Sequence, residues 1–320
     1  MSPRTRIRLV VATLAVAAAV VVAAAAVLSA DEVASAPAVS EQAKPRKGSP
    51  PLELSFGLRD DAEARELRQA ADLYARGLRR DAARLFAAHD ALEAKVGAAF
   101  SAWPASEDRI EQLGALYPRS ALVQLHVGLA RLWAGVGGAA TAWREARDVE
   151  PDTPYAVRAD DFLHPTFAPG LPRFTPSFAY RVPGGTAAEQ LEALRRDRSS
   201  HGRLLYGVAL QRLGQPVSAR RTFAEALALE PASVDALVAD AVGRYTKSDP
   251  SAAFSRLGPL SRRFPNAATV RFHLGVLLLW QAAVPEAKRQ LRLAQKAEPG
   301  SRIAREAGRY VREIGKIGTG

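Results

Sequence analysis

Three consecutive stretches decide the fold: SHGRLLYGVALQRLGQPVSARRTFAEALALEP (200–231), ASVDALVADAVGRYTKSDPSAAFSRLGPLSRRFP (232–265) and NAATVRFHLGVLLLWQAAVPEAKRQLRLAQKAEP (266–299). Each ends on a proline, and Pro231, Pro265 and Pro299 lie 34 residues apart (265 − 231 = 34; 299 − 265 = 34). Apolar residues recur with helical spacing inside each stretch. A helical pattern that repeats at a fixed period and closes on a turn proline predicts a solenoid of stacked helix pairs.

Small and large apolar residues occupy equivalent places in the three stretches. Gly207 and Gly275 stand where two helices must cross closely, and Phe223, Leu257 and Leu291 fill the space between neighbouring pairs. One pair cannot bury its own apolar face, so several must stack. The predicted fold class is therefore all-α. The equivalent sets are Gly207, Ala219, Phe223, Ala226, Pro231; Ala241, Ala253, Leu257, Leu260, Pro265; and Gly275, Ala287, Leu291, Ala294, Pro299.

These residues resemble the tetratricopeptide repeat (TPR) family, whose units are about 34 residues long. The resemblance covers units 200–233, 234–267 and 268–301 and extends in part to residues 60–163. It implies a TPR-like helix–turn–helix solenoid that binds a protein or peptide partner on its concave face. The family offers no catalytic residue to carry over, so we predict a protein that is not an enzyme and needs no cofactor.

Residues 118–151 repeat the pattern of residues 265–299. The distance from proline to glycine is 10 residues and from proline to tryptophan 15 in both copies. His126 and His273 fall at the same place in the two copies, which favours packing over metal binding. The matched residues are Tyr117, Pro118, Gly128 and Trp133 in one copy and Phe264, Pro265, Gly275 and Trp280 in the other.

The N-terminus predicts a membrane tether. Residues 1–8 carry Arg4, Arg6 and Arg8, and residues 9–28 form an apolar run whose one polar member is Thr13. A 20-residue run is long enough to cross a hydrocarbon core of about 30 Å as one transmembrane helix. The alternative is a signal peptide cut at a small-residue site and a secreted product. Both place the basic residues in the cytoplasm and the folded part outside.

The rest of the chain divides by composition. Residues 29–59 are rich in Ala, Ser and Pro and predict a flexible linker. Helical repeats are expected over 60–163 and 186–301, separated by a Pro- and aromatic-rich insertion at 164–185 that we expect to be ordered. Residues 302–320 predict a capping helix and tail. Its expected inward side chains are Ile303, Tyr310, Val311 and Ile314, and its expected outward ones Arg302, Arg305, Glu306, Arg309 and Arg312.

Composition excludes several kinds of chemistry. The chain has 320 residues and no cysteine, which excludes disulfides, thiol nucleophiles and cysteine zinc sites. The net charge is +11, but only seven of 44 basic residues are lysine and the arginines lie beside acidic residues, as expected of a GC-rich genome. We therefore expect no nucleic-acid partner. The alternative is an electrostatic binder of anionic wall polymer or lipid headgroups through surface arginines.

Other motifs have simpler interpretations. Gly135–Ala140 reads GVGGAA and matches a dinucleotide fingerprint, but that motif needs a preceding strand, and a turn between two helices is favoured. The five histidines, His89, His126, His164, His201 and His273, show no metal-ligand spacing. We therefore predict no metal site.

The candidate site is the concave groove of the solenoid. One hypothesis places an apolar or helical segment of another envelope protein there, with Trp133 and Trp280 as buried anchors. The other has the 164–185 insertion fold back and fill the groove. Both hypotheses stay open from sequence. The groove residues are Leu125, Leu129, Trp133, Leu204, Val208, Phe272, Val276 and Trp280.

Overall fold

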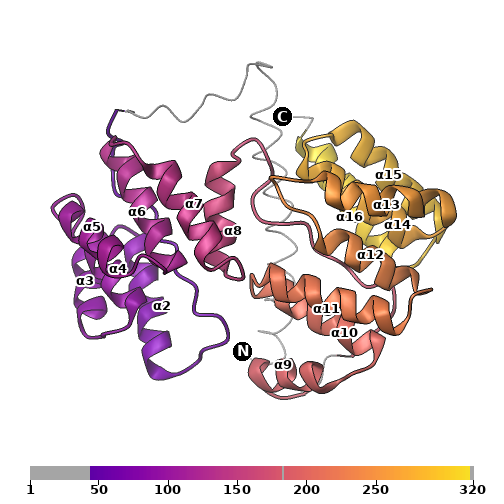
Figure 1. The fold of residues 1–320 in the computed structure, drawn as a ribbon, viewed down its shortest axis with the longest axis horizontal. Coiled ribbons are helices and arrows are strands. Elements are labelled where there is room, and N and C mark those ends of the chain that lie inside the picture. Colours follow the sequence, from indigo (N-terminus) through magenta and orange to yellow (C-terminus); the bar gives the residue numbers. More distant parts are fainter. Residues whose placement is uncertain (1–43, 182–183, 318–320) are drawn as a thin grey trace. The chain divides into compact units, whose positions relative to one another are not determined.

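The computed structural model describes residues 44–181 and 184–317. Within these ranges the regular structure is entirely α-helical, with no strand (Figure 1). The chain forms two compact units. Of the described residues, the N-terminal unit takes 44–163 together with 213–216, and the C-terminal unit takes the described parts of 164–212 and 217–317. The predicted span 9–28 lies outside the described residues, and no helix within them combines the length and apolar character that a bilayer crossing requires.

The N-terminal unit consists of three helix pairs and a closing helix. The first helices of successive pairs pack on one another, α2 on α4 and α4 on α6, and α6 packs on the closing helix α8. The second helices α3, α5 and α7 lie behind them. The helices are α2 (Ala62–Ala75), α3 (Arg79–Ala87), α4 (Leu92–Ser101), α5 (Glu107–Leu116), α6 (Ala121–Ala134), α7 (Ala139–Val149) and α8 (Pro154–Leu163).

The C-terminal unit has the same plan with one added helix. α9 precedes the pairs and packs on α10, and α10, α12, α14 and α16 form the inner row. The helices are α9 (Ala187–Arg196), α10 (Ser200–Arg212), α11 (Pro216–Leu229), α12 (Val234–Gly243), α13 (Ser251–Arg263), α14 (Ala268–Trp280), α15 (Val284–Ala297) and α16 (Arg302–Ile317). Repeated helix pairs in each unit confirm the TPR-like fold predicted from the sequence.

Small residues make the close helix crossings. A Cβ atom added to Gly207 would lie 2.3 Å from the ring of Phe223, and one added to Gly275 would lie 2.9 Å from Leu291 Cγ. Phe223, Leu257 and Leu291 are each 0 % exposed. Full burial of such a side chain stabilises the fold by about 1.5–3 kcal/mol relative to exposure, so these positions hold the stack together. The predicted division between small crossing residues and large filling residues is confirmed.

Turn glycines separate the helices of a pair. Gly135 ends α6 in the left-handed conformation at φ 72°, and Gly138 precedes α7 at φ 86°. A side chain at such φ values is disfavoured, so glycine is the suitable residue there. The four residues 135–138 are thus the turn between α6 and α7, as predicted, and Ala139 and Ala140 begin α7.

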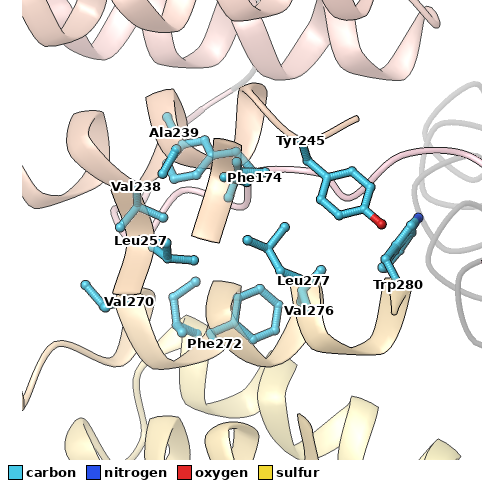
Figure 2. Close-up of a cluster of buried hydrophobic side chains, with 14 of the residues drawn as sticks. Phe174, Val238, Ala239, Tyr245, Leu257, Val270, Phe272, Val276, Leu277 and Trp280 are labelled. Carbon is cyan, nitrogen blue, oxygen red and sulfur yellow. The ribbon is translucent and has the colours of Figure 1, made fainter. Parts of the chain in front are cut away.

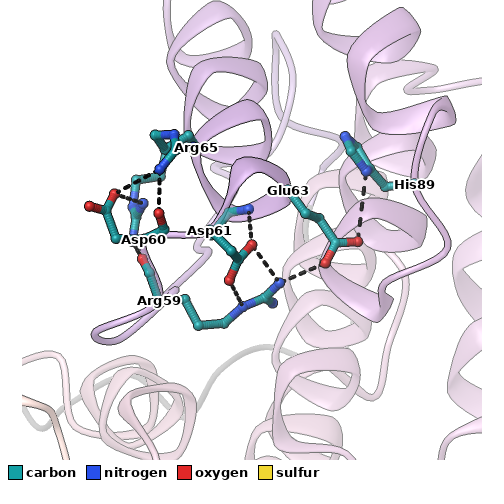
Figure 3. Close-up of polar contacts among 8 residues, drawn as sticks. Arg59, Asp60, Asp61, Glu63, Arg65 and His89 are labelled. Carbon is teal, nitrogen blue, oxygen red and sulfur yellow. Dashed lines mark hydrogen bonds and ion pairs between the residues drawn. The ribbon is translucent and has the colours of Figure 1, made fainter. Parts of the chain in front are cut away.

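An exposed polar network fixes the start of α2 (Figure 3). The Asp61 carboxylate accepts the Ala64 N–H at 2.8 Å and caps the helix. Arg59 lies 3.2 Å from Asp61 and 2.6 Å from Glu63, whose other oxygen is 3.7 Å from His89. A cap of this kind contributes about 1 kcal/mol, and exposed ion pairs about 0.2–1 kcal/mol each. The network therefore defines one helix end and contributes little to the stability of the whole.

The closing helix α16 differs from its prediction at one residue. Ile303 and Ile314 are buried, as expected. The prediction that Arg302 faces outward is wrong, because its guanidinium lies 4.9 Å from the ring centroid of Tyr180 and 3.5 Å from the Phe178 carbonyl oxygen. The reason is that α16 begins beside an extended stretch of chain that the helical pattern does not reveal.

Candidate functional site

The predicted groove residues line the inner row of helices, and all of them are covered. Leu125, Leu129 and Trp133 lie on α6, Leu204 and Val208 on α10, and the remaining three on α14. Seven of the eight are at most 6 % exposed, and Trp133 is half-buried. Two extended stretches of the same chain cover them. We call residues 46–58 the first segment and residues 168–180 the second segment.

A histidine receives the backbone of the second segment. The Thr175 N–H donates to His273 Nε2 at 2.9 Å, and His273 Nδ1 lies 2.7 Å from the Thr269 carbonyl oxygen. Since a carbonyl oxygen only accepts, the proton of the neutral ring is on Nδ1, which leaves Nε2 free to accept. The Phe174 ring stacks on His273 with centroids 5.2 Å apart. This histidine therefore holds the segment through a main-chain group.

Further contacts fix both ends of the second segment. Trp280 Nε1 donates to the Gly170 carbonyl at 3.2 Å, and the Phe174 N–H donates to Gln211 Oε1 at 3.0 Å. Ser177 Oγ donates to Asp235 at 2.6 Å. Phe174 lies among side chains of α12 and α14, inside the hydrophobic cluster (Figure 2). The second segment is thus part of the core of the C-terminal unit.

The first segment is held in the same way in the N-terminal unit. The Glu53 N–H donates to His126 Nε2 at 3.1 Å, and His126 Nδ1 lies 2.7 Å from the Leu122 carbonyl oxygen. Tyr74 Oη donates to the Pro50 carbonyl at 2.6 Å. The Tyr155 hydroxyl accepts the Ser55 N–H at 3.1 Å and donates to the Ser55 carbonyl at 3.0 Å. Both tyrosine hydroxyls thus hydrogen-bond main-chain groups of the first segment.

The two segments share a sequence pattern once the histidine contacts align them. Glu53 and Thr175 are equivalent (175 − 53 = 122), and the same offset pairs a glycine, a proline, an apolar residue and a Ser-Phe dipeptide. Both glycines are left-handed, at φ 82° and 72°. Each unit is therefore one copy of a module made of a segment, three helix pairs and a closing helix. The aligned pairs are Gly48 and Gly170, Pro50 and Pro172, Leu52 and Phe174, Ser55 and Ser177, and Phe56 and Phe178.

Burial keeps both histidines neutral. Desolvation lowers the pKa of His126 to about 4 and that of His273 to about 4, while the hydrogen bond from each ring to its own helix acts weakly in the opposite direction. A protonated ring carries hydrogens on both nitrogens and cannot accept the segment N–H. The hold on each segment therefore depends on the unprotonated ring.

The tryptophans of the two grooves differ in their partners. Trp280 Nε1 has a carbonyl partner, whereas Trp133 Nε1 is buried without a hydrogen-bond partner among the described residues. Arg46 instead places its guanidinium 5.0 Å from the Trp133 ring centroid, and the backbone N–H of Arg46 donates to the Trp133 carbonyl oxygen at 2.8 Å. A cation–π contact thus replaces a hydrogen bond at this position.

These contacts bear on three predictions from the sequence. The described part of the insertion 164–185 fills the groove of the C-terminal unit through residues 170–178, as the second hypothesis proposed. Residues 29–59 were expected to be a flexible linker, but the described part, 44–59, includes the first segment. Leu52, Leu54 and Phe56 alternate apolar and polar positions and pack on the core, which is the signal of an extended segment. His126 and His273 are packed, as expected, and serve also as acceptors.

Two observations concern metal binding and acid–base chemistry. Among the residues that the structure describes, no group of three or more His, Asp and Glu side chains is placed to hold a metal ion. Asp235 is desolvated, which raises its pKa, while hydrogen bonds from Ser177 and Thr269 oppose the shift. Asp235 thus links Ser177 of the second segment to Thr269 of α14, so it has a positioning role.

Comparison with known proteins yields only distant structural similarity. No protein-family model and no curated protein matches the chain. Yeast Tom70 matches with 14 % identity and a TM-score of 0.36, covering 84 % of this chain and 52 % of its own. One chain of the APC/C hetero-tetramer Cut9–Hcn1 matches with 14 % identity and a TM-score of 0.27, and the match covers 81 % of this chain and 57 % of that chain. This chain thus spans about half the length of either, and the likeness is too weak to carry function.

Proposed function

We propose that the protein is a non-catalytic TPR-like scaffold that holds extended polypeptide in its grooves. The supporting observation is that His126 and His273 bind main-chain N–H groups, at 3.1 and 2.9 Å, and that Trp280 binds a main-chain carbonyl. Main-chain groups are common to all sequences, so a partner segment with an apolar residue at the Phe174 position can make the same contacts. The partner is a protein or peptide of the cell envelope that replaces a segment of this chain.

The proposal includes a membrane tether. Residues 9–28 are long and apolar enough to cross a bilayer, and basic residues precede them. The folded units then lie on the extracytoplasmic side. Membrane fractionation of cells that express the full chain or a form lacking residues 1–30 tests this part. The full chain is expected in the membrane pellet after a carbonate wash, and its appearance in the soluble fraction would remove the tether from the proposal.

A peptide-uptake experiment tests the groove. Phe174 is 2 % exposed and anchors the second segment, so Phe174→Ala weakens the segment and leaves the groove residues intact. A fluorescent peptide with the sequence of residues 165–181 is titrated against the full chain and against this variant. The variant is expected to bind the peptide at least ten times more tightly than the unaltered chain, because the intact segment competes with it.

Two controls make the result specific. The same peptide with alanine at its Phe174 position is expected to lose binding, and Leu52→Ala, which alters the other groove, is expected to leave binding unchanged. Circular dichroism checks that each variant keeps its helices. If the Phe174→Ala variant is folded but does not bind the peptide, the groove is a closed core and the proposal is refuted.

A further inference from the structure

The two segments lie antiparallel to equivalent helices, α6 and α14. In each unit a tryptophan at the end of the helix contacts the start of the segment, and a histidine in the middle of the helix contacts its centre. The two segments are therefore two examples of one mode of binding. The contacts are Arg46 with Trp133 and Glu53 with His126 on α6, and Gly170 with Trp280 and Thr175 with His273 on α14.

Alternate residues of the second segment face the groove. Pro172, Phe174 and Pro176 are buried, whereas Arg173 is exposed. An extended chain points successive side chains to opposite sides, so every second residue meets the helices. The groove therefore selects apolar residues two positions apart. The equivalent residues of the first segment are also apolar and are buried or packed on the core: Pro50, Leu52 and Leu54 (172 − 50 = 122).

A left-handed glycine precedes the apolar positions in both segments. Gly48 has φ 82° and Gly170 has φ 72°, and a Cβ atom added to either would meet nothing within 4 Å. The backbone conformation, and not crowding, therefore favours glycine at this position. In the second segment the turn directs the Gly170 carbonyl oxygen to Trp280 Nε1. A ligand needs the same turn to make this contact.

Asp235 contacts the serine that follows the apolar positions. Ser177 donates to its carboxylate twice, from Oγ at 2.6 Å and from the main-chain N–H at 3.4 Å, and Thr269 Oγ1 donates at 3.3 Å. An ionised carboxylate only accepts hydrogen bonds. It therefore favours a hydroxyl at this position and repels an acidic or phosphorylated side chain. The first segment also has a serine here, Ser55.

We propose that the C-terminal groove recognises the linear motif Gly-x-Pro-x-Φ-x-Φ-Ser-Phe, where Φ is apolar, and that Asp235 determines the specificity for its serine. The inference rests on the proposed function of the groove and names the class of its ligand, an extended apolar peptide with an unmodified serine. The last motif position is Phe178, whose ring centroid lies 4.4 Å from that of His201 on α10. Phe56 stands at the same position in the first segment.

Peptide competition tests the motif on the full chain carrying Phe174→Ala, with a labelled peptide of residues 165–181. An unlabelled peptide of residues 44–60 is expected to displace the label at a concentration within about tenfold of that needed by unlabelled 165–181. In the 165–181 peptide, Gly170→Ala and Pro172→Ala are each expected to weaken binding about tenfold. Thr175→Ala alters a position between the buried ones and is expected to weaken binding less than about twofold.

A pair of peptides with matched shape tests the role of Asp235. Ser177→Asn and Ser177→Asp in the 165–181 peptide differ in charge but hardly in volume. The Ser177→Asp peptide is expected to bind about tenfold more weakly than the Ser177→Asn peptide, because its charge faces the Asp235 carboxylate. Asp235→Asn in the protein is expected to remove this difference. If Asp235 only supported the fold, its substitution would weaken both peptides equally and leave their ratio unchanged.

The outcomes distinguish the motif from the groove function. If the 165–181 peptide binds but the 44–60 peptide does not displace it, or if Gly170→Ala, Pro172→Ala and Thr175→Ala weaken it equally, the motif is refuted and the groove function stands. If the 165–181 peptide does not bind a folded protein, both are refuted. Pro172→Ala in the protein removes another buried residue of the second segment and replaces Phe174→Ala if circular dichroism shows that the latter is unfolded.

Discussion

The two units place an extended segment at the same point of the same helical frame, yet they fix it with different side chains. In the N-terminal unit two tyrosine hydroxyls and an ion pair do this, with Arg158 2.8 Å from Glu53. In the C-terminal unit an amide, a carboxylate and a tryptophan serve the same purpose. The histidine acceptor is common to both.

This difference distinguishes the contacts that both units share from the contacts that only one unit makes. An acceptor buried at the centre of the inner row fixes the register of the segment, and the remaining contacts are interchangeable as long as each main-chain group finds a partner. Substitutions made at equivalent positions of the two units therefore test which contacts belong to the common frame.

The largest difference in stability loss between the two units is expected at Phe174 and its equivalent Leu52. Phe174→Ala removes a ring that is 2 % exposed, and the cavity is expected to cost about 3–5 kcal/mol of unfolding free energy. Leu52→Ala removes a smaller, half-buried side chain and is expected to cost about 1–2 kcal/mol. Hydrogen exchange measured by mass spectrometry reports the two units separately.

In that experiment the loss of protection is expected to be confined to the unit that carries the substitution. The Thr175 amide, which donates to His273, serves as the local probe in one unit, and the Glu53 amide serves in the other. Equal losses for the two variants would contradict the view that the C-terminal segment is the more deeply packed of the two.

A pH titration is expected to weaken both segments. Since the pKa of each histidine falls from 6.5 to about 4 on folding, the unfolded chain binds the proton first as the pH drops. The contribution of each histidine to the free energy of unfolding is complete above about pH 6.5. It falls by about 3 kcal/mol between about pH 6.5 and pH 4 and stays constant below that. Denaturant unfolding at a series of pH values measures the decline.

Asp235 distinguishes the units in this titration. Its raised pKa means that the folded state gains a proton before the unfolded state does, which offsets part of the loss in the C-terminal unit near pH 4. The N-terminal unit is therefore expected to weaken more. Gln accepts a hydrogen bond but does not titrate, so His126→Gln and His273→Gln should each remove one share of the pH dependence. A pH profile that neither substitution alters would refute the histidine assignment.

The sequence predicts the helical frame better than it predicts the site. Gly207, Phe223 and Leu291 repeat at a fixed period because every helix pair meets the same packing constraint, so one sequence reveals them. The segments obey no such period. Their position depends on long-range contacts, such as that between Glu53 and His126, 73 residues apart. Arg302 was misplaced for the same reason, because helical periodicity says nothing of what covers the first turn.

A moderate difference in stability loss between the two units is expected at the helix crossings, at Gly128 and Gly275. A Cβ atom at Gly128 would lie 2.3 Å from Trp143 Nε1, while one at Gly275 would lie 2.9 Å from Leu291 Cγ. Overpacking costs about 1–3 kcal/mol, partly offset by the better helix propensity of alanine. Gly128→Ala is therefore expected to destabilise its unit by about 2 kcal/mol and Gly275→Ala by less. Thermal unfolding of the two variants tests the ranking, and a larger effect at Gly275 would contradict it.

The smallest contrast is expected at the two groove tryptophans. Trp280→Phe keeps most of the ring volume but loses the hydrogen bond to the Gly170 carbonyl, which is expected to cost about 1 kcal/mol. Trp133→Phe removes an N–H that has no partner among the described residues. Removing this buried donor relieves its desolvation cost, which offsets the lost packing, so the change in unfolding free energy is expected to be near zero. Exchange rates of the amides near Gly170 and near Arg46 measure the two effects. A loss at Trp133 as large as that at Trp280 would mean that the indole N–H of the N-terminal unit has an acceptor after all, and that the two grooves bind their segments more alike than the described residues show.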